Sequence, residues 1–198
     1  MADLVDAIQT VEKMKAAMDA FLAFAHAELR GIAEAQAERA RADTSDGDFA
    51  HRSMAAEVAV ATRVSQDQAA RVLERSGDLT ERYPATLQAL RDGAISREHA
   101  MAITSAGRRL STQEARGEFE RVVLECAAGE TAFHTRRIAN IIAERIEPDD
   151  AEQRCERARA RRTVWLTDLD DGLAELGAIL PAELAHGAFD RVRRMAAA

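Results

Sequence analysis

The sequence predicts a mostly α-helical protein: a multi-helix bundle with a long N-terminal helix and one β-hairpin near the C-terminus. Three observations support this fold class. Of the 198 residues, 47% are hydrophobic but only 4% are aromatic, and alanine dominates the apolar set, which favours closely packed helices over a β-sandwich. The whole chain contains only three prolines and ten glycines. Residues 49–147 carry repeated start and stop signals of short helices.

Residues 1–42 are predicted to form one long helix, followed by a linker of turn-forming residues at 43–48. Within the helix, apolar residues recur at alternating steps of four and three, the a/d spacing of a heptad repeat, with an interruption at Lys15. Two interpretations stay open: the helix packs along its own domain, or it forms a self-associating seam that makes a homodimer. The candidate dimerisation residues are Leu4, Ile8, Val11, Met18, Leu22, Leu29 and Ile32.

Residues 49–147 are predicted to form a helical bundle whose short helices begin at capping residues and end at glycine or proline. The most specific signal is a capping box, with Ser111 at the N-cap and Glu114 at the third helical position. Gly77 is expected to kink its helix, and Gly107 to end another. The predicted helices cover residues 49–62, 65–82, 84–92, 96–107, 111–128 and 131–147.

Residues 148–198 are predicted to contain an arginine-rich helix, a β-hairpin and a C-terminal helix. Thr163–Leu166 and Leu173–Ile179 are the expected strands, joined by a turn at Asp168–Gly172. The last helix begins at Pro181 and continues through Met195. It stops without a cap or a polar tail, so we expect the chain to be cut from a longer protein.

The arginine-rich helix is the strongest sign of a binding partner. Residues 154–162 place five arginines and one glutamate in nine positions of a chain whose formal net charge is −7. Nucleic acids are the natural partners of such clusters, although carboxylates just upstream offer internal neutralisation instead. The predicted phosphate-contacting residues are Arg154, Arg157, Arg159, Arg161 and Arg162, with Arg136 and Arg137 added if the two helices pack together.

A second candidate site is the segment Val58–Leu73, which resembles a helix-turn-helix. In that arrangement Gln66, Gln68 and Arg71, on the first turns of the second helix, would face base edges. Any pair of capped helices with a small residue at the crossing gives the same pattern. The segment 95–103 repeats it, with Arg97, Glu98 and His99 in front.

The sequence shows no recognisable catalytic or metal-ligating pattern. Its five histidines are scattered, and it lacks HExxH, CxxC and a Gly-rich phosphate loop. We therefore expect this chain to be no enzyme and to bind no cofactor. No apolar stretch reaches the roughly 18 residues of a membrane span, and the N-terminus carries no secretory signal, so a cytoplasmic protein without membrane contact is expected.

One longer motif resembles a known family. Residues 83–100 read YPATLQALRDGAISREHA, close to the pattern LPxTLxALxxGxISxxHA of the actinobacterial domain of unknown function 222. This helical region is found N-terminal to HNH endonuclease motifs. The resemblance covers the chain from Phe49 onward and implies a non-catalytic helical part, truncated before any nuclease domain. A divalent metal is then expected only if an HNH motif follows downstream.

Three functions remain open. The leading hypothesis is a non-catalytic accessory domain of an HNH endonuclease-like protein that contacts DNA through the arginine-rich helix. The first alternative is a homodimerising protein-interaction module without nucleic-acid binding, which the acidic character of residues 1–48 favours. The second is a winged-helix-like transcription regulator, with residues 163–179 as the wing.

Overall fold

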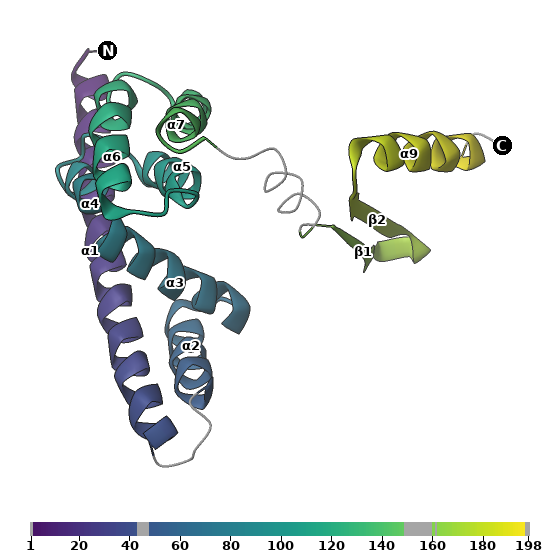
Figure 1. Cartoon of the computed structure of the whole chain (residues 1–198), viewed down its shortest axis with the longest axis horizontal. Helices are drawn as coiled ribbons and strands as arrows, with labels where there is room; N and C mark the ends of the chain where they lie inside the picture. The colour runs from purple at the N-terminus through teal and green to yellow at the C-terminus, as the bar shows by residue number, and fades with distance from the viewer. Residues whose placement is uncertain (1, 43–47, 149–159, 161, 197–198) are drawn as a thin grey trace. The chain divides into compact units, whose positions relative to one another are not determined.

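The computed structural model describes residues 2–42, 48–148, 160 and 162–196 (Figure 1). The chain divides into two compact units, Met1–Glu147 and Pro148–Ala198. The described part of the first unit is helical, and the second contains a two-stranded hairpin and a helix. The predicted fold class is therefore confirmed. The arginine-rich segment 154–162 lies outside the described residues except for Ala160 and Arg162.

The helices of the first unit follow the predicted order closely, including the long N-terminal helix. Their bounds are α1 (Ala2–Ala42), α2 (Asp48–Thr62), α3 (Gln66–Arg82), α4 (Pro84–Arg91), α5 (Arg97–Gly107), α6 (Gln113–Ala127) and α7 (Ala132–Ile146).

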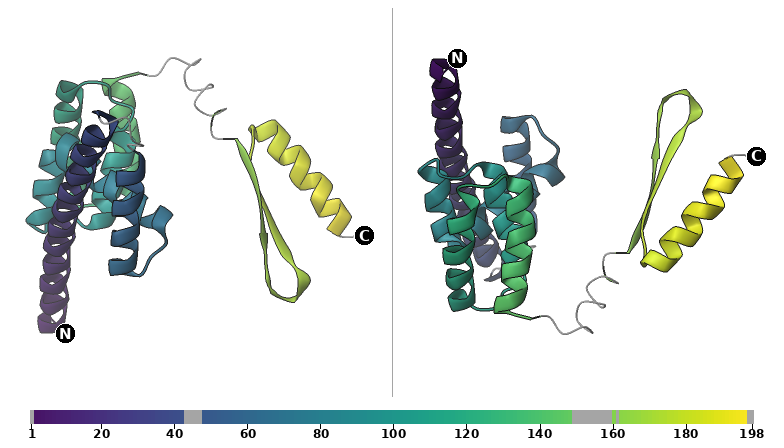
Figure 2. Two further views of the ribbon diagram at one scale, coloured as in Figure 1. Left: turned by 90° about the horizontal axis from the view of Figure 1, so that it is seen from below. Right: turned by 90° about the horizontal axis from the view of Figure 1, so that it is seen from above.

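α1 is the longest helix of this unit, and α2, α3, α4 and α5 pack along it (Figures 1 and 2). The face that it buries consists of alanines: Ala16, Ala20 and Ala23 in its first part, then Ala33 and Ala37. Small side chains let the axes of neighbouring helices approach closely. The helix thus packs along its own domain, through positions other than the bulky ones of the heptad pattern.

Two clusters of buried apolar side chains hold the first unit together. The larger cluster joins α1 to α3–α7 around Tyr83 and Phe119, both 0% exposed. The smaller cluster joins α2 and α3, around Val58 and Leu73, with Leu29 of α1 packed against it. The unit therefore has two lobes that share one long helix.

Two predicted details are wrong. Thr112, rather than Ser111, is the N-cap of α6, and Thr112 Oγ1 accepts a hydrogen bond from Ala115 N (3.1 Å). Ser111 instead donates its backbone N–H to Glu147 Oε2 (2.8 Å), a tertiary contact that the local pattern cannot reveal. α3 is also continuous through Gly77, where the missing side chain leaves room for the Arg30 side chain from α1.

The corrected cap gives a test with its own control. A T112A substitution should lower the free energy of unfolding by about 1 kcal/mol, because one amide at the start of α6 loses its acceptor. S111A should change it by less than about 0.5 kcal/mol, because the contact of Ser111 with Glu147 uses the backbone. Urea unfolding of both variants measures the difference. A larger effect of S111A than of T112A would instead support Ser111 as the N-cap, as the sequence predicted.

The second unit contains β1 (Thr163–Asp168), β2 (Ala174–Ile179) and α9 (Ala182–Ala196). The strands pair antiparallel, with Trp165 opposite Gly177. The turn between them contains a short 3-10 helix in which Asp171 and Gly172 have φ of 59° and 74°. The hairpin is therefore confirmed, although β1 extends two residues beyond its expected end.

Candidate functional site

A groove of about 570 Å³ opens between the two lobes of the first unit. Residues of α1, α2, α3, α4, α5 and α7 line it, together with Val64 just after α2 and Arg108 just after α5. Its apolar lining includes Leu22, Val58 and Met101. The groove thus joins parts of the chain that are far apart in sequence.

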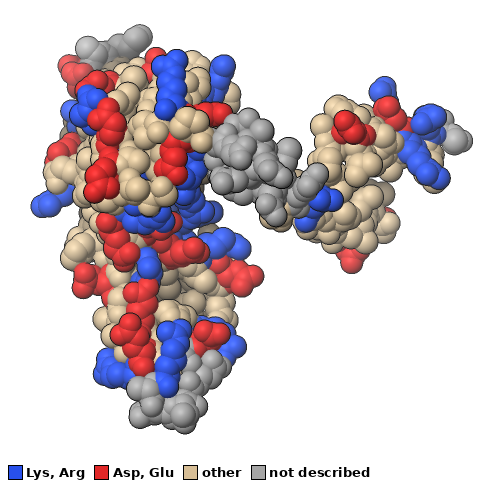
Figure 3. All heavy atoms as spheres, in the orientation of Figure 1, with Lys and Arg blue, Asp and Glu red and all other residues tan. Residues whose placement is uncertain are grey.

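Four arginines give the groove its charge. Arg75 comes from α3, Arg97 from α5 and Arg136 from α7, and Arg108 is the fourth. Asp19 is the one carboxylate among the residues that line this groove. Figure 3 shows blue side chains gathered across the middle of the first unit, at the level between α5 and α3, with red ones beside them. An excess of positive charge in one groove is informative in a chain whose net charge is −7.

Most of these guanidinium groups are available to a ligand. Arg75, Arg97 and Arg136 are exposed, and within the described residues their side chains make no ion pair or hydrogen bond. Arg108 is different, because it contacts Asp78 Oδ2 (3.3 Å). His26 also lines the groove, where burial, and then the nearby charge of Arg97, lower its pKa. A neutral His26 adds no further charge to this site.

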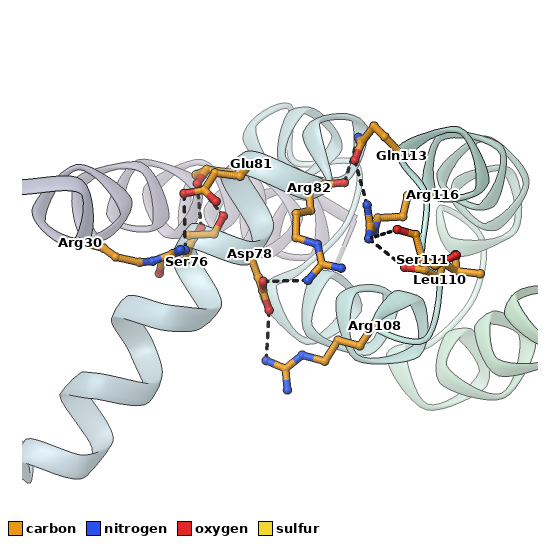
Figure 4. Close-up of polar contacts among 12 residues, drawn as sticks. Arg30, Ser76, Asp78, Glu81, Arg82, Arg108, Leu110, Ser111, Gln113 and Arg116 are labelled. Carbon is orange, nitrogen blue, oxygen red and sulfur yellow. Dashed lines mark hydrogen bonds and ion pairs between the residues drawn. The ribbon is translucent and has the colours of Figure 1, made fainter. Parts of the chain in front are cut away.

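Figure 4 shows how the edge of the groove is held. Asp78 of α3 accepts from both Arg82 (3.4 Å) and Arg108 (3.3 Å), so it links α3 to the end of α5. Arg116 of α6 donates to the carbonyl oxygens of Leu110 (2.9 Å) and Ser111 (3.1 Å). The contact of Asp78 with Arg108 thus ties α3 to the end of α5 beside the groove, whereas the bonds of Arg116 hold the start of α6 against the loop before it. Both sets of contacts occupy the arginines that make them.

The structure brings together two of the residues predicted to bind nucleic acid. Gln68 and Arg136 line the same groove, although they are on α3 and α7. Three others lie elsewhere: Gln66 donates to the Arg52 carbonyl oxygen (3.1 Å), and Arg71 and Arg137 are exposed outside the groove. Arg162 is exposed in the second unit. The remaining candidates lie outside the described residues: Arg154, Arg157, Arg159 and Arg161.

Sequence reasoning missed Arg75 and Arg108 as groove residues. Arg75 follows Gln68 by seven residues, so two turns of α3 place both side chains on one face. That spacing was available in the sequence. Arg108 gave no comparable signal, because its position depends on how α5 ends against α3.

The motif at residues 83–100 is mainly structural. Thr86 and Leu90 are buried, and Gly93 has a φ of 70°, which suits glycine at this turn. Ser96 N donates to His99 Nδ1 (3.3 Å), and His99 Nε2 is 2.9 Å from the Glu130 carbonyl oxygen. Both ring nitrogens of His99 are thus used in capping α5 and fixing the loop before α7.

Most of the heptad residues of α1 are exposed, although Leu22 also lines the groove. Leu29 is half-buried against the smaller core cluster. The other six candidate dimerisation residues are exposed: Leu4, Ile8, Val11, Met18, Leu22 and Ile32.

Across the described residues, no group of three or more His, Cys, Asp or Glu side chains has an arrangement that holds a metal ion. None of the described helices combines the length and apolarity needed to cross a membrane.

Comparison with known proteins gives one match. The model of a family described as "Domain of unknown function (DUF222)" matches residues 16–198. No curated protein and no solved structure matches the chain.

Proposed function

The chain belongs to the DUF222 family, and we propose that it is a non-catalytic accessory domain that contacts DNA phosphates through the arginine-lined groove. One observation carries the proposal: Arg75, Arg97, Arg108 and Arg136 line a single groove with one carboxylate, Asp19. Guanidinium groups bind phosphate oxygens in a planar, bidentate geometry, and phosphate contacts supply most of the affinity for duplex DNA.

The amide side chains of the groove fit the same role. Gln68 is on the first turn of α3, the second helix of the helix-turn-helix-like pair, and Asn140 is on α7 beside Arg136. Amides suit the donor and acceptor edge of adenine. The arginines would then position the duplex, and Gln68 is the residue placed to distinguish bases.

The proposal extends to the arginine-rich segment 154–162 as an additional phosphate contact. It assigns catalysis, and any divalent metal, to an HNH motif in a longer protein, as the family resemblance implies. The chain itself would supply position on DNA rather than chemistry.

Charge reversal in the groove tests the proposal. The triple variant R75E/R97E/R136E should bind a fluorescent duplex at least about tenfold more weakly at low salt. The slope of log affinity against log salt concentration should fall by about 3, because each lost phosphate contact removes close to one released counterion. Fluorescence anisotropy at several salt concentrations measures both quantities.

R91E is the matched control, since Arg91 is exposed on α4 and does not line the groove. A second triple variant, R154E/R157E/R161E, separates the groove from the arginine-rich segment. If only that variant weakens binding, the groove is not the site. If the unmodified chain does not bind duplex DNA at low salt, the whole proposal fails.

A further inference from the structure

α1 has two apolar faces, and only one of them is covered. Its alanines pack into the first unit, whereas its bulky side chains face solvent along most of the helix. Leu4, at 71%, is the most exposed of these bulky side chains, and the half-buried Leu29 is the exception among them. We define the apolar stripe as Leu4, Ile8, Val11, Met14, Met18, Phe21, Leu22 and Ile32.

The apolar stripe is large enough to form a specific interface. Its eight side chains are exposed by about half to two thirds each, which leaves on the order of 900 Å² uncovered, against about 800 Å² per partner in a standard interface. Scattered single apolar residues are normal on a surface, but an exposed apolar area of this size, seven of whose eight residues lie within Leu4–Leu22, marks an interaction site.

The N-terminal end of α1 adds a second observation. Every residue from Asp3 to Lys15 is exposed, and Figure 2 shows this end extending past the other helices of the first unit. Within this segment Lys13 lies against Gly93, but a helical segment of this length with so little tertiary packing is only marginally stable in water. A partner that covers the stripe would stabilise the extension as well.

We propose that the partner is a second copy of this chain, bound through an antiparallel pairing of the two α1 helices. The heptad spacing of the stripe requires a helix with the same spacing opposite it, and α1 itself has that spacing. Closed twofold dimers are also the commonest form of homo-oligomer. The occupant that fits the stripe is therefore another α1.

Lys15 decides the direction of pairing. In a parallel pair with matched register, the two Lys15 side chains would meet within the seam, and like charges there are unfavourable. In the antiparallel pair, Lys15 lies opposite the small Ala25 of the second copy. The carboxylate of Glu28, one helical turn beyond Ala25 in the second copy, is then within reach of Lys15. In the single chain, Lys15 forms an ion pair only with the exposed Glu12 (3.0 Å) among the described residues.

The same register matches the other layers of the seam. Ile8 lies opposite Ile32 and Met18 opposite Leu22 of the second copy, whereas Val11 lies opposite the half-buried Leu29, which offers only part of its side chain. The two Phe21 side chains then lie beside each other near the twofold axis, whereas the two Ile8 residues are about 36 Å apart along the helices.

Light scattering after size exclusion tests the dimer. The chain should elute with twice its monomer mass of 21.6 kDa, and M18E/L22E should return it to the monomer mass while its helical circular dichroism is unchanged. V60E/F133E is the control, because Val60 and Phe133 are exposed apolar residues outside the stripe. A monomer mass at every concentration up to about 200 μM, where even a weak Kd is visible, overturns the proposal. A dimer that survives M18E/L22E overturns it as well.

Disulfide cross-linking tests the direction. In a C126S/C155S background, F21C should form a covalent dimer under mild oxidation, and I8C should not. The reverse result, with cross-linking at residue 8 alone, contradicts the antiparallel arrangement.

Discussion

Replacing Gly107 with alanine is expected to lower the free energy of unfolding by about 3 kcal/mol, because the new methyl group has no space. A Cβ at this position would lie 2.7 Å from both Cε1 and Oη of Tyr83 and 3.0 Å from Cε1 of Phe119. Both rings are 0% exposed and belong to the larger core cluster, so neither can swing into solvent. Thermal unfolding should show a fall in Tm of about 10 °C.

The opposite sign is expected at Gly117. This glycine is on the exposed side of α6, and nothing lies within 4 Å of an added Cβ, so G117A should stabilise the protein by about 0.5–1 kcal/mol. Tyr83 Oη is buried without a hydrogen-bond partner among the described residues. Y83F should therefore recover part of the stability that G107A loses, because it removes Tyr83 Oη, one of the three atoms that the new methyl group would meet. Equal effects of G107A and G117A would contradict the packing explanation.

Gly107 also shows what the sequence could and could not predict. Its position at the end of α5 follows from a local signal, as do the heptad spacing of α1 and the turn before Gly172. The reason for glycine at 107 is instead a contact with Tyr83, 24 positions earlier in the chain. Local sequence patterns were therefore enough to locate the helices and strands, whereas the structural role of an individual residue depends on how these elements pack together.

The candidate site was harder to predict for the same reason. Gln68 and Arg136 were expected to bind nucleic acid, but no local pattern indicates that they share a groove with Arg75, Arg97 and Arg108. The charges converge only when α3 and α5 pack on α1 and α7 packs on α5. The heptad pattern had a similar limit: it identified the bulky face of α1 correctly but did not show that alanines form the face that packs into the domain.

The buried carboxylate of Glu120 provides the second large effect. Tyr83, the N-cap residue of α4, makes no side-chain capping bond. Glu120 reaches across from α6 instead, and its Oε1 accepts from both Thr86 N and Thr86 Oγ1, each at 2.7 Å. A carboxylate at this position satisfies amides of the first turn and interacts favourably with the positive end of the α4 dipole.

Removing this acceptor should be among the most destabilising single changes in the chain. E120A should lower the free energy of unfolding by about 3 kcal/mol, because it leaves two buried donors without a partner. E125A on the exposed side of the same helix should change it by less than about 0.5 kcal/mol, since exposed ion pairs contribute little. Urea unfolding of the two variants measures the contrast, which would be absent if Glu120 were only a space-filling side chain.

E120Q separates the charge of Glu120 from its hydrogen bonds. Burial raises the pKa of Glu120 above its ordinary value of 4.5, although the hydrogen bonds from Thr86 act in the opposite direction. A carboxyl group whose pKa is raised by folding gives its full contribution to stability below about pH 4.5, and this contribution is lost as pH rises through the folded-state pKa. The unmodified protein should therefore lose stability relative to E120Q as pH rises above about 4.5. The measurement is the free energy of unfolding of both proteins as a function of pH. If the two values change in parallel as pH rises above about 4.5, folding does not raise the pKa of Glu120.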